Sequence, residues 1–281
     1  MTYVKKPAWL KTNIHSAENY QLVNKLVKEH GLHTICTSGR CPNLSECWNR
    51  GTATFMILGE ICTRACRFCN TLTGKPLPPD VDEPTKVAES IKRMKLKHAV
   101  ITSVDRDDLP DKGAAHWAKT IRAIKKINSD TTIEVLIPDF DGDTMLLNLV
   151  LAEKPDVISH NMETVRRLTP QIRTKAKYDT SLHVLKYIST NNITAKTGVM
   201  LGLGETEEEI LQLMDDVLQM GCSVITIGQY MQPSRKNVAV TEYIHPDKFA
   251  EYKQIGLQKG FRIVESAPLV RSSYCAEKHL V

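Results

Sequence analysis

Long apolar runs are missing from this sequence of 281 residues. No stretch of 18 apolar residues occurs, and the N-terminal segment MTYVKKPAWLK lacks the apolar core of a signal peptide. Internal repeats, low-complexity tracts and a basic stripe interleaved with aromatic residues are also absent, so repeat folds are excluded and nothing indicates nucleic-acid binding. Hydrophobic residues make up 42% and charged residues 25%, which excludes disordered and collagen-like classes. We therefore expect a cytoplasmic globular protein with no membrane or nucleic-acid partner.

Charge of one sign does not dominate, because the formal net charge is only +5. Residues 1–50 nevertheless hold seven Lys or Arg against three Glu. This local bias suits an acidic partner surface, and a solvated basic face explains it equally well.

Cysteine, in contrast, is abundant. The chain has eight, and six of them lie between positions 36 and 69. A protein kept in a reducing compartment does not need so many thiols for packing, and disulfides are rare there. The cysteines therefore indicate metal or redox chemistry.

After residue 50 the sequence alternates short β-branched runs with amphipathic stretches, the pattern of parallel strands joined by helices. The pattern predicts an α/β fold, a partial or complete (β/α)6 TIM-like barrel with N- and C-terminal extensions. We expect an extension over 1–50, a barrel over 51–264 and a tail over 265–281. The predicted strands are 54–58, 98–102, 132–137, 156–160, 193–200 and 223–228.

One helix is predicted with defined ends, over about 207–220. Thr206 and Glu209 form a capping box at its start, and Gly221 fits a C-terminal cap. Its apolar stripe belongs to the core.

The first cysteine set is Cys62, Cys66 and Cys69, spaced Cys-x3-Cys-x2-Cys directly after the strand TFMIL. The carboxyl ends of parallel barrel strands are where active sites form. Thiolates suit iron–sulfur clusters or zinc, but structural zinc is normally closed by four ligands. Three ligands on a cubane leave one iron open, which favours a cluster with a free position over a zinc half-site.

The second set is Cys36, Cys41 and Cys47, spaced Cys-x4-Cys-x5-Cys. These residues are predicted ligands of a separate cluster. An electron relay and a zinc site are both open on spacing alone. Cys222, at a predicted helix-to-strand turn, is interpreted as a buried small hydrophobe.

The motifs CTSGRCPNLSECW, TFMILGEICTRACRFC, ITSVDRDDL, ISHNMETV, MLGLGET and VRSSY occur in this order between about residues 30 and 275. Together they resemble the lipoyl synthase family of the radical S-adenosylmethionine superfamily. The resemblance implies two [4Fe-4S] clusters and S-adenosyl-L-methionine as cofactors. It implies that Cys62, Cys66 and Cys69 hold the cluster that generates a deoxyadenosyl radical.

The resemblance also implies that a serine of the tail completes the cluster on Cys36, Cys41 and Cys47. We assign this ligand to Ser273, with Ser272 as the alternative and Cys275 as a weaker rival. Arg271 is assigned a role in positioning the tail or polarising the cluster.

The substrate implied by the family is an octanoyl group carried on a lysine of a lipoyl carrier domain or of the glycine-cleavage H protein. Sulfur from the second cluster enters at C6 and C8. The reaction also requires an electron donor such as flavodoxin or ferredoxin.

Five polar residues at or near strand ends are candidate contacts for S-adenosylmethionine: Thr102, Ser103, Asn161, Glu163 and Lys196. By resemblance Asn161 and Glu163 are preferred. Each of them could instead be a capping or loop residue.

Two other functions remain open on sequence alone. One is another radical enzyme of the same superfamily that inserts sulfur into a different substrate. The other is a non-catalytic iron–sulfur electron carrier or zinc-stabilised binding module, which predicts closed four-ligand sites and no cleavage of S-adenosylmethionine.

Overall fold

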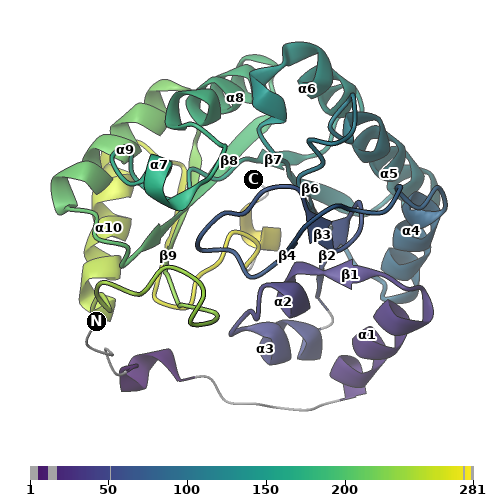
Figure 1. Cartoon of the computed structure of the whole chain (residues 1–281), viewed down its shortest axis with the longest axis horizontal. Coiled ribbons are helices and arrows are strands. Elements are labelled where there is room, and N and C mark those ends of the chain that lie inside the picture. Colours follow the sequence, from purple (N-terminus) through teal and green to yellow (C-terminus); the bar gives the residue numbers. More distant parts are fainter. Residues whose placement is uncertain (1–5, 12–17, 51, 275, 280–281) are drawn as a thin grey trace.

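The computed structural model describes residues 6–11, 18–50, 52–274 and 276–279. Within them, eight strands form one sheet in the order β1-β2-β5-β6-β7-β8-β9-β10, which curves into a ring with helices outside it (Figure 1). Strand β1 pairs antiparallel with β2, and every other pair in this sheet is parallel. The strands are β1 (His33–Thr34), β2 (Thr54–Ile57), β5 (His98–Ser103), β6 (Thr132–Leu136), β7 (Val157–Ser159), β8 (Thr194–Leu201), β9 (Val224–Gln229) and β10 (Ile263–Ser266). A separate parallel pair consists of β3 (Ile61–Cys62) and β4 (Leu72–Thr73).

Helices cover the outer face of the sheet and connect successive strands (Figure 1). This outer layer consists of α4 (Glu83–Arg93), α5 (Ala114–Ile127), α6 (Thr144–Leu151), α8 (Tyr178–Thr190), α9 (Glu207–Gln219) and α10 (Pro246–Lys259). The short helix α7 (Thr169–Ile172) lies inside this layer, where the Ile172 carbonyl accepts from the backbone N–H of Arg67 (Figure 1). The N-terminal segment adds α1 (Glu18–Glu29), α2 (Ile35–Ser38) and α3 (Leu44–Asn49), and short 3-10 helices occur at η1 (Ala8–Leu10), η2 (Phe140–Gly142) and η3 (Ala276–His279).

The predicted fold class is confirmed, and all six predicted strands form. The sheet extends farther than expected at both edges, since β1 joins it from the N-terminal segment and β10 adds a seventh parallel strand. In the described residues β1 and β10 do not pair with each other, so the barrel is open.

The predicted helix forms as α9 with the expected ends. The Thr206 side chain accepts from the backbone N–H of Glu209, and the Glu209 side chain accepts from the backbone of Thr206. Gly221 follows the helix with φ 76°, the left-handed conformation that favours glycine. Buried Ile210, Leu213 and Val217 direct one face of α9 to the core. No helix in the described ranges is long and apolar enough to cross a membrane.

Candidate functional site

The first cysteine set lies where it was predicted, on the loop that follows β2. Cys62 ends β3, and the chain returns through Cys66 and Cys69 to β4. Backbone N–H groups of Arg64 and Asp105 donate to Sγ of Cys62 over 3.4 and 3.3 Å. Burial and the neighbouring Asp105 carboxylate raise the pKa of Cys62 to about 12, and these two backbone donors oppose that shift.

Arg64 fixes the loop between the first two cysteines of this set. Its guanidinium is buried and forms hydrogen bonds with Asp107 at 2.8 and 2.9 Å and with Asp139 at 2.8 and 3.0 Å. These carboxylates follow β5 and β6, so one side chain joins the cysteine loop to two neighbouring strand ends. Burial opposes the charge, but the two carboxylates outweigh it and raise the pKa of Arg64.

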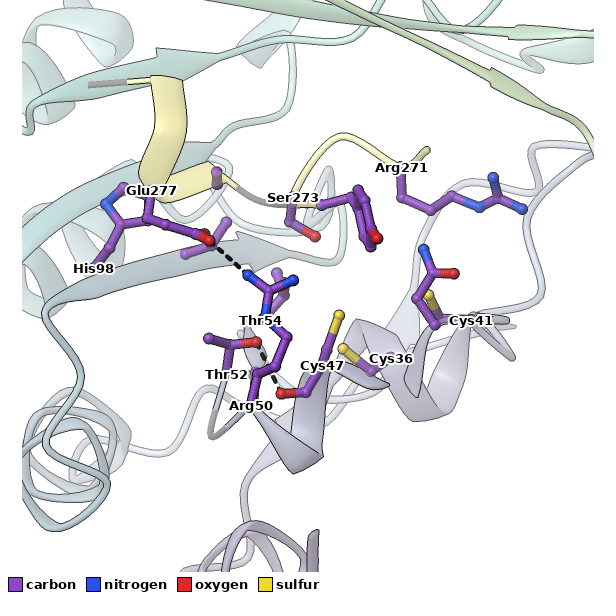
Figure 2. A pocket seen from close by; sticks show the side chains of 15 residues that line it. Cys36, Cys41, Cys47, Arg50, Thr52, Thr54, His98, Arg271, Ser273 and Glu277 are labelled. Atoms are coloured by element: carbon purple, nitrogen blue, oxygen red, sulfur yellow. Dashed lines mark hydrogen bonds and ion pairs between the residues drawn. The ribbon is translucent and has the colours of Figure 1, made fainter. Parts of the chain in front are cut away.

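The second cysteine set lines a pocket together with residues of the C-terminal tail (Figure 2). Cys36 belongs to α2 and Cys47 to α3, and Cys41 lies on the connection between these helices. In Figure 2 the hydroxyl of Ser273 lies across from the sulfur atoms of Cys47 and Cys36. Ser273 therefore meets cysteines that precede it by 226 or more positions.

The donor chemistry of this pocket fits an iron–sulfur cluster. Burial, followed by the charge of Cys41, raises the pKa of Cys36 to about 11, and burial with Cys36 and Cys41 raises that of Cys47 to about 12. Three thiolates this close are unfavourable without a bound cation. All the described cysteines are free of disulfides.

The same thiols do not form a preorganised zinc site. Among the described residues, no group of three His, Cys, Asp or Glu side chains could hold a single metal ion. Every sulfur that binds a zinc ion lies about 2.3 Å from that one ion. The thiolates of a cubane bind different irons, so their sulfur atoms lie farther from one another than those of a zinc site.

The tail separates its two serines. The Ser272 hydroxyl accepts a hydrogen bond of 2.7 Å from Nδ2 of Asn161, whereas Ser273 lines the pocket of the second cysteine set. Arg271 lines the same pocket and donates to the Val270 carbonyl over 2.6 Å. Burial lowers the pKa of Arg271, and Cys41 opposes this shift. Cys275 lies outside the described residues.

Three polar contacts hold the tail against the helix that carries Cys47, and we call them the tail clasp. They connect Asn43 Nδ2 with the Leu269 carbonyl at 2.7 Å, Tyr274 Oη with Glu46 at 2.9 Å, and Arg50 with Glu277 at 2.6 Å. Because these contacts flank Cys47 on one side and Ser273 on the other, they fix the two across the pocket.

Two glycines on the inner face of the barrel make room for the tail. A Cβ at Gly228 in β9 would overlap the Val270 carbonyl oxygen. A Cβ at Gly198 in β8 would lie 3.1 Å from the Ser272 hydroxyl and 2.9 Å from Oδ1 of Asn161. Neither glycine has a left-handed φ, so close approach of the tail, and not backbone conformation, requires glycine here.

We expect Gly228→Ala to displace the tail while the barrel stays folded. The added methyl overlaps backbone atoms, and overpacking of this kind costs about 1–3 kcal/mol. Sulfur transfer should fall relative to cleavage of S-adenosylmethionine, measured as product formed per 5′-deoxyadenosine. Gly74→Ala is the control, because its Cβ would meet only Ile61 at an ordinary 3.4 Å. An unchanged ratio in Gly228→Ala would contradict this role of the tail contact.

Four of the five predicted cofactor contacts lie at or just after the carboxyl ends of parallel strands. Thr102 and Ser103 end β5, and Asn161 and Glu163 follow β7. Oγ of Ser103 and Oδ1 of Asn161 are buried without a hydrogen-bond partner among the described residues. Such atoms cost about 1–3 kcal/mol each, so both suit a polar ligand such as S-adenosylmethionine. Burial raises the pKa of Glu163, whose carboxylate accepts from Asn161 at 3.1 Å.

The geometry does not support Lys196 as a cofactor contact. Its ammonium is fully buried and donates to both oxygens of Glu134 at 2.7 and 2.9 Å. Glu134 also accepts from Ser159 at 3.0 Å. A buried charge needs its partner, so Lys196 forms an interior ion pair beneath the site.

Sequence reasoning missed Arg64, the two barrel glycines and the tail clasp. The sequence does hold a signal for Arg64, because it lies between two predicted ligand cysteines. If the loop buries this guanidinium, carboxylates must pair with its charge. The clasp and the glycine contacts join segments far apart in the chain, so no local pattern reports them.

The chain is similar to known proteins along nearly its whole length. The model of the radical SAM superfamily matches residues 56–217. The chain is 64% identical to the lipoyl synthase of Parabacteroides distasonis over 278 residues, covering 99% of each chain. It is 58% identical to that of Treponema denticola, covering 99% of this chain and 96% of the relative.

Solved structures share the fold at low identity. Streptococcus suis SuiB bound to S-adenosylmethionine has a TM-score of 0.59 at 10% identity, covering 92% of this chain and 59% of SuiB. Methylornithine synthase, PylB, has a TM-score of 0.56 at 10% identity, covering 92% of this chain and 81% of PylB. With the near-full-length relatives, these findings place the chain in the lipoyl synthase family of the radical S-adenosylmethionine superfamily.

Proposed function

We propose that this enzyme inserts two sulfur atoms, at C6 and C8, into an octanoyl group carried on a lysine of a lipoyl carrier domain or H protein. The observation that carries the proposal is the meeting of Cys36, Cys41, Cys47 and Ser273 in one pocket beside a radical S-adenosylmethionine barrel. An electron carrier does not need such a second ligand set built from both ends of the chain.

The two ligand sets have separate tasks. With S-adenosylmethionine, a cluster on Cys62, Cys66 and Cys69 would supply the radical that abstracts hydrogen from an unactivated C–H bond. No side-chain base can remove such a hydrogen near neutral pH. A second cluster would supply the sulfur. The chain holds the first set on the Arg64-anchored loop. It holds the second set between α2, α3 and the tail.

Asn161 connects the two centres. Its Nδ2 donates to Ser272, next to the proposed ligand Ser273, and its unpartnered Oδ1 belongs to the proposed cofactor contacts. We infer that Asn161, Glu163, Ser103 and Thr102 bind S-adenosylmethionine. Flavodoxin or ferredoxin is the proposed electron donor.

Anaerobic reconstitution followed by a sulfur-insertion assay tests this function. About eight irons per chain are expected for two [4Fe-4S] clusters, with 5′-deoxyadenosine formed under reducing conditions. An octanoyl-lysine peptide should gain the mass of two sulfur atoms. Cleavage of S-adenosylmethionine without modification of the peptide would favour a sibling sulfur-inserting enzyme, and no cleavage would favour an electron carrier.

A further inference from the structure

Three loops from distant parts of the chain meet around Cys69. Nδ2 of Asn237 donates to the Cys69 carbonyl at 2.7 Å, and the backbone of Val238 donates to the Arg67 carbonyl at 3.0 Å. Nδ2 of Asn70 donates to the Ser38 carbonyl at 2.8 Å. The loop of the first cysteine set is therefore joined to the segment after β9 and to α2, and Figure 1 places these segments on one side of the barrel.

These three loops carry positive charge without compensating carboxylates. Residues 35–45, 61–79 and 230–240 contain no Asp or Glu. Five cations of these loops are exposed, and among the described residues none of the five forms an ion pair. We call them the basic collar: Arg40, Arg67, Lys75, Arg235 and Lys236.

The position of the basic collar relates it to both ligand sets. Arg40 lies between Cys36 and Cys41, and Arg67 lies between Cys66 and Cys69. Arg40 donates to the Pro233 carbonyl at 3.1 Å, so it reaches the loop that carries Arg235 and Lys236. The loops that carry this charge therefore lie beside both cysteine sets.

We propose that the basic collar is the docking surface for the octanoylated carrier protein, which it binds through an acidic surface around the acylated lysine. The inference rests on the proposed function and adds the recognition of the protein part of the substrate. Uncompensated charge of one sign attracts a partner of the other sign and accelerates association. An electron donor has no need to approach Arg40 beside the second cysteine set, whereas the octanoyl group must reach both sets.

Charge reversal at Arg235 and Lys236 tests this docking surface, because these two residues lie on neither cysteine loop. We compare kcat/KM for an octanoylated H protein with kcat/KM for an octanoyl-lysine peptide, using a chemical reductant. In the Arg235→Glu, Lys236→Glu variant the ratio of protein to peptide should fall at least about 10-fold, mainly through KM, because like charges now face each other. The loss should shrink with added salt, since the Debye length falls from about 10 Å at 0.1 M to about 3 Å at 1 M.

The matched control is Lys119→Glu with Lys126→Glu, two exposed lysines on α5 in the outer helical layer. This control should keep the wild-type ratio. The proposal is overturned if the collar variant behaves like the control, or if its loss appears only when a protein reductant replaces the chemical one. Failure of the proposed function is a different result, because the wild-type enzyme would then thiolate neither substrate.

Discussion

Replacing Cys66 with alanine should abolish both the cleavage of S-adenosylmethionine and sulfur insertion. Cys66 is one of only three protein ligands proposed for the first cluster, so its loss removes the centre on which every later step depends. We expect 5′-deoxyadenosine formation to fall at least about 10³-fold, since residues that act as a unit fail together. The measurements are iron content, which should fall by about half, and 5′-deoxyadenosine by chromatography.

Cys222→Ala is the matched control for this substitution. Cys222 is fully buried, and its Sγ lies 3.4 Å from the carbonyl oxygen of Ala195. Loss of the buried sulfur should lower the free energy of unfolding by roughly 1–2 kcal/mol and leave iron content and cleavage intact. Wild-type cleavage by Cys66→Ala would remove the basis for the assigned cluster.

Replacing Ser273 with alanine should abolish most sulfur insertion while cleavage of S-adenosylmethionine continues. Ser273 faces the second cysteine set, whereas the first set lies on a different loop. We expect the yield of thiolated product to fall at least about 10²-fold, because a lost cluster ligand cannot be replaced by binding elsewhere. 5′-deoxyadenosine should still form within a few-fold of the wild-type amount. The measurement is product mass per 5′-deoxyadenosine.

Ser272→Ala is the matched control for Ser273→Ala, because the two serines are adjacent in the tail. Its hydroxyl accepts a hydrogen bond from Asn161, so alanine removes a hydrogen bond of about 1 kcal/mol. Product yield should therefore fall less than about 10-fold. If Ser272→Ala lost the product and Ser273→Ala kept it, the ligand assignment would be reversed.

Much of the barrel could be predicted because its signals are local. Buried parallel strands appear as short β-branched runs, and the α9 capping box lies within four residues of sequence. The sequence pattern does not reveal strands β1 and β10, and the reasons are physical. The first has only two residues, and the second, IVES, is half polar because it lies at an edge of the sheet.

The cysteine sets could also be predicted, because cluster ligands need short, defined spacings. The roles of Ser273 and Lys196 depend on partners far away in the chain. Ser272 and Ser273 are chemically identical, and they are distinguished by distant partners: Asn161 binds Ser272, whereas Ser273 lines the pocket of the second cysteine set. The position of Lys196 in a barrel strand predicts a cofactor contact, but its ammonium forms an ion pair with Glu134 on another strand. Non-local contacts of this kind leave no periodic pattern.

The second ligand pocket draws Cys36, Cys41 and Cys47 from near the start of the chain and Ser273 from near its end. During synthesis on the ribosome, the three thiols emerge long before the hydroxyl that faces them. The proposed ligands of the first cluster lie on one loop, but the proposed ligand set of the second cluster is complete only after translation has passed residue 273. A chain cut short before that point would keep the barrel strands and consume its cofactor without yielding product.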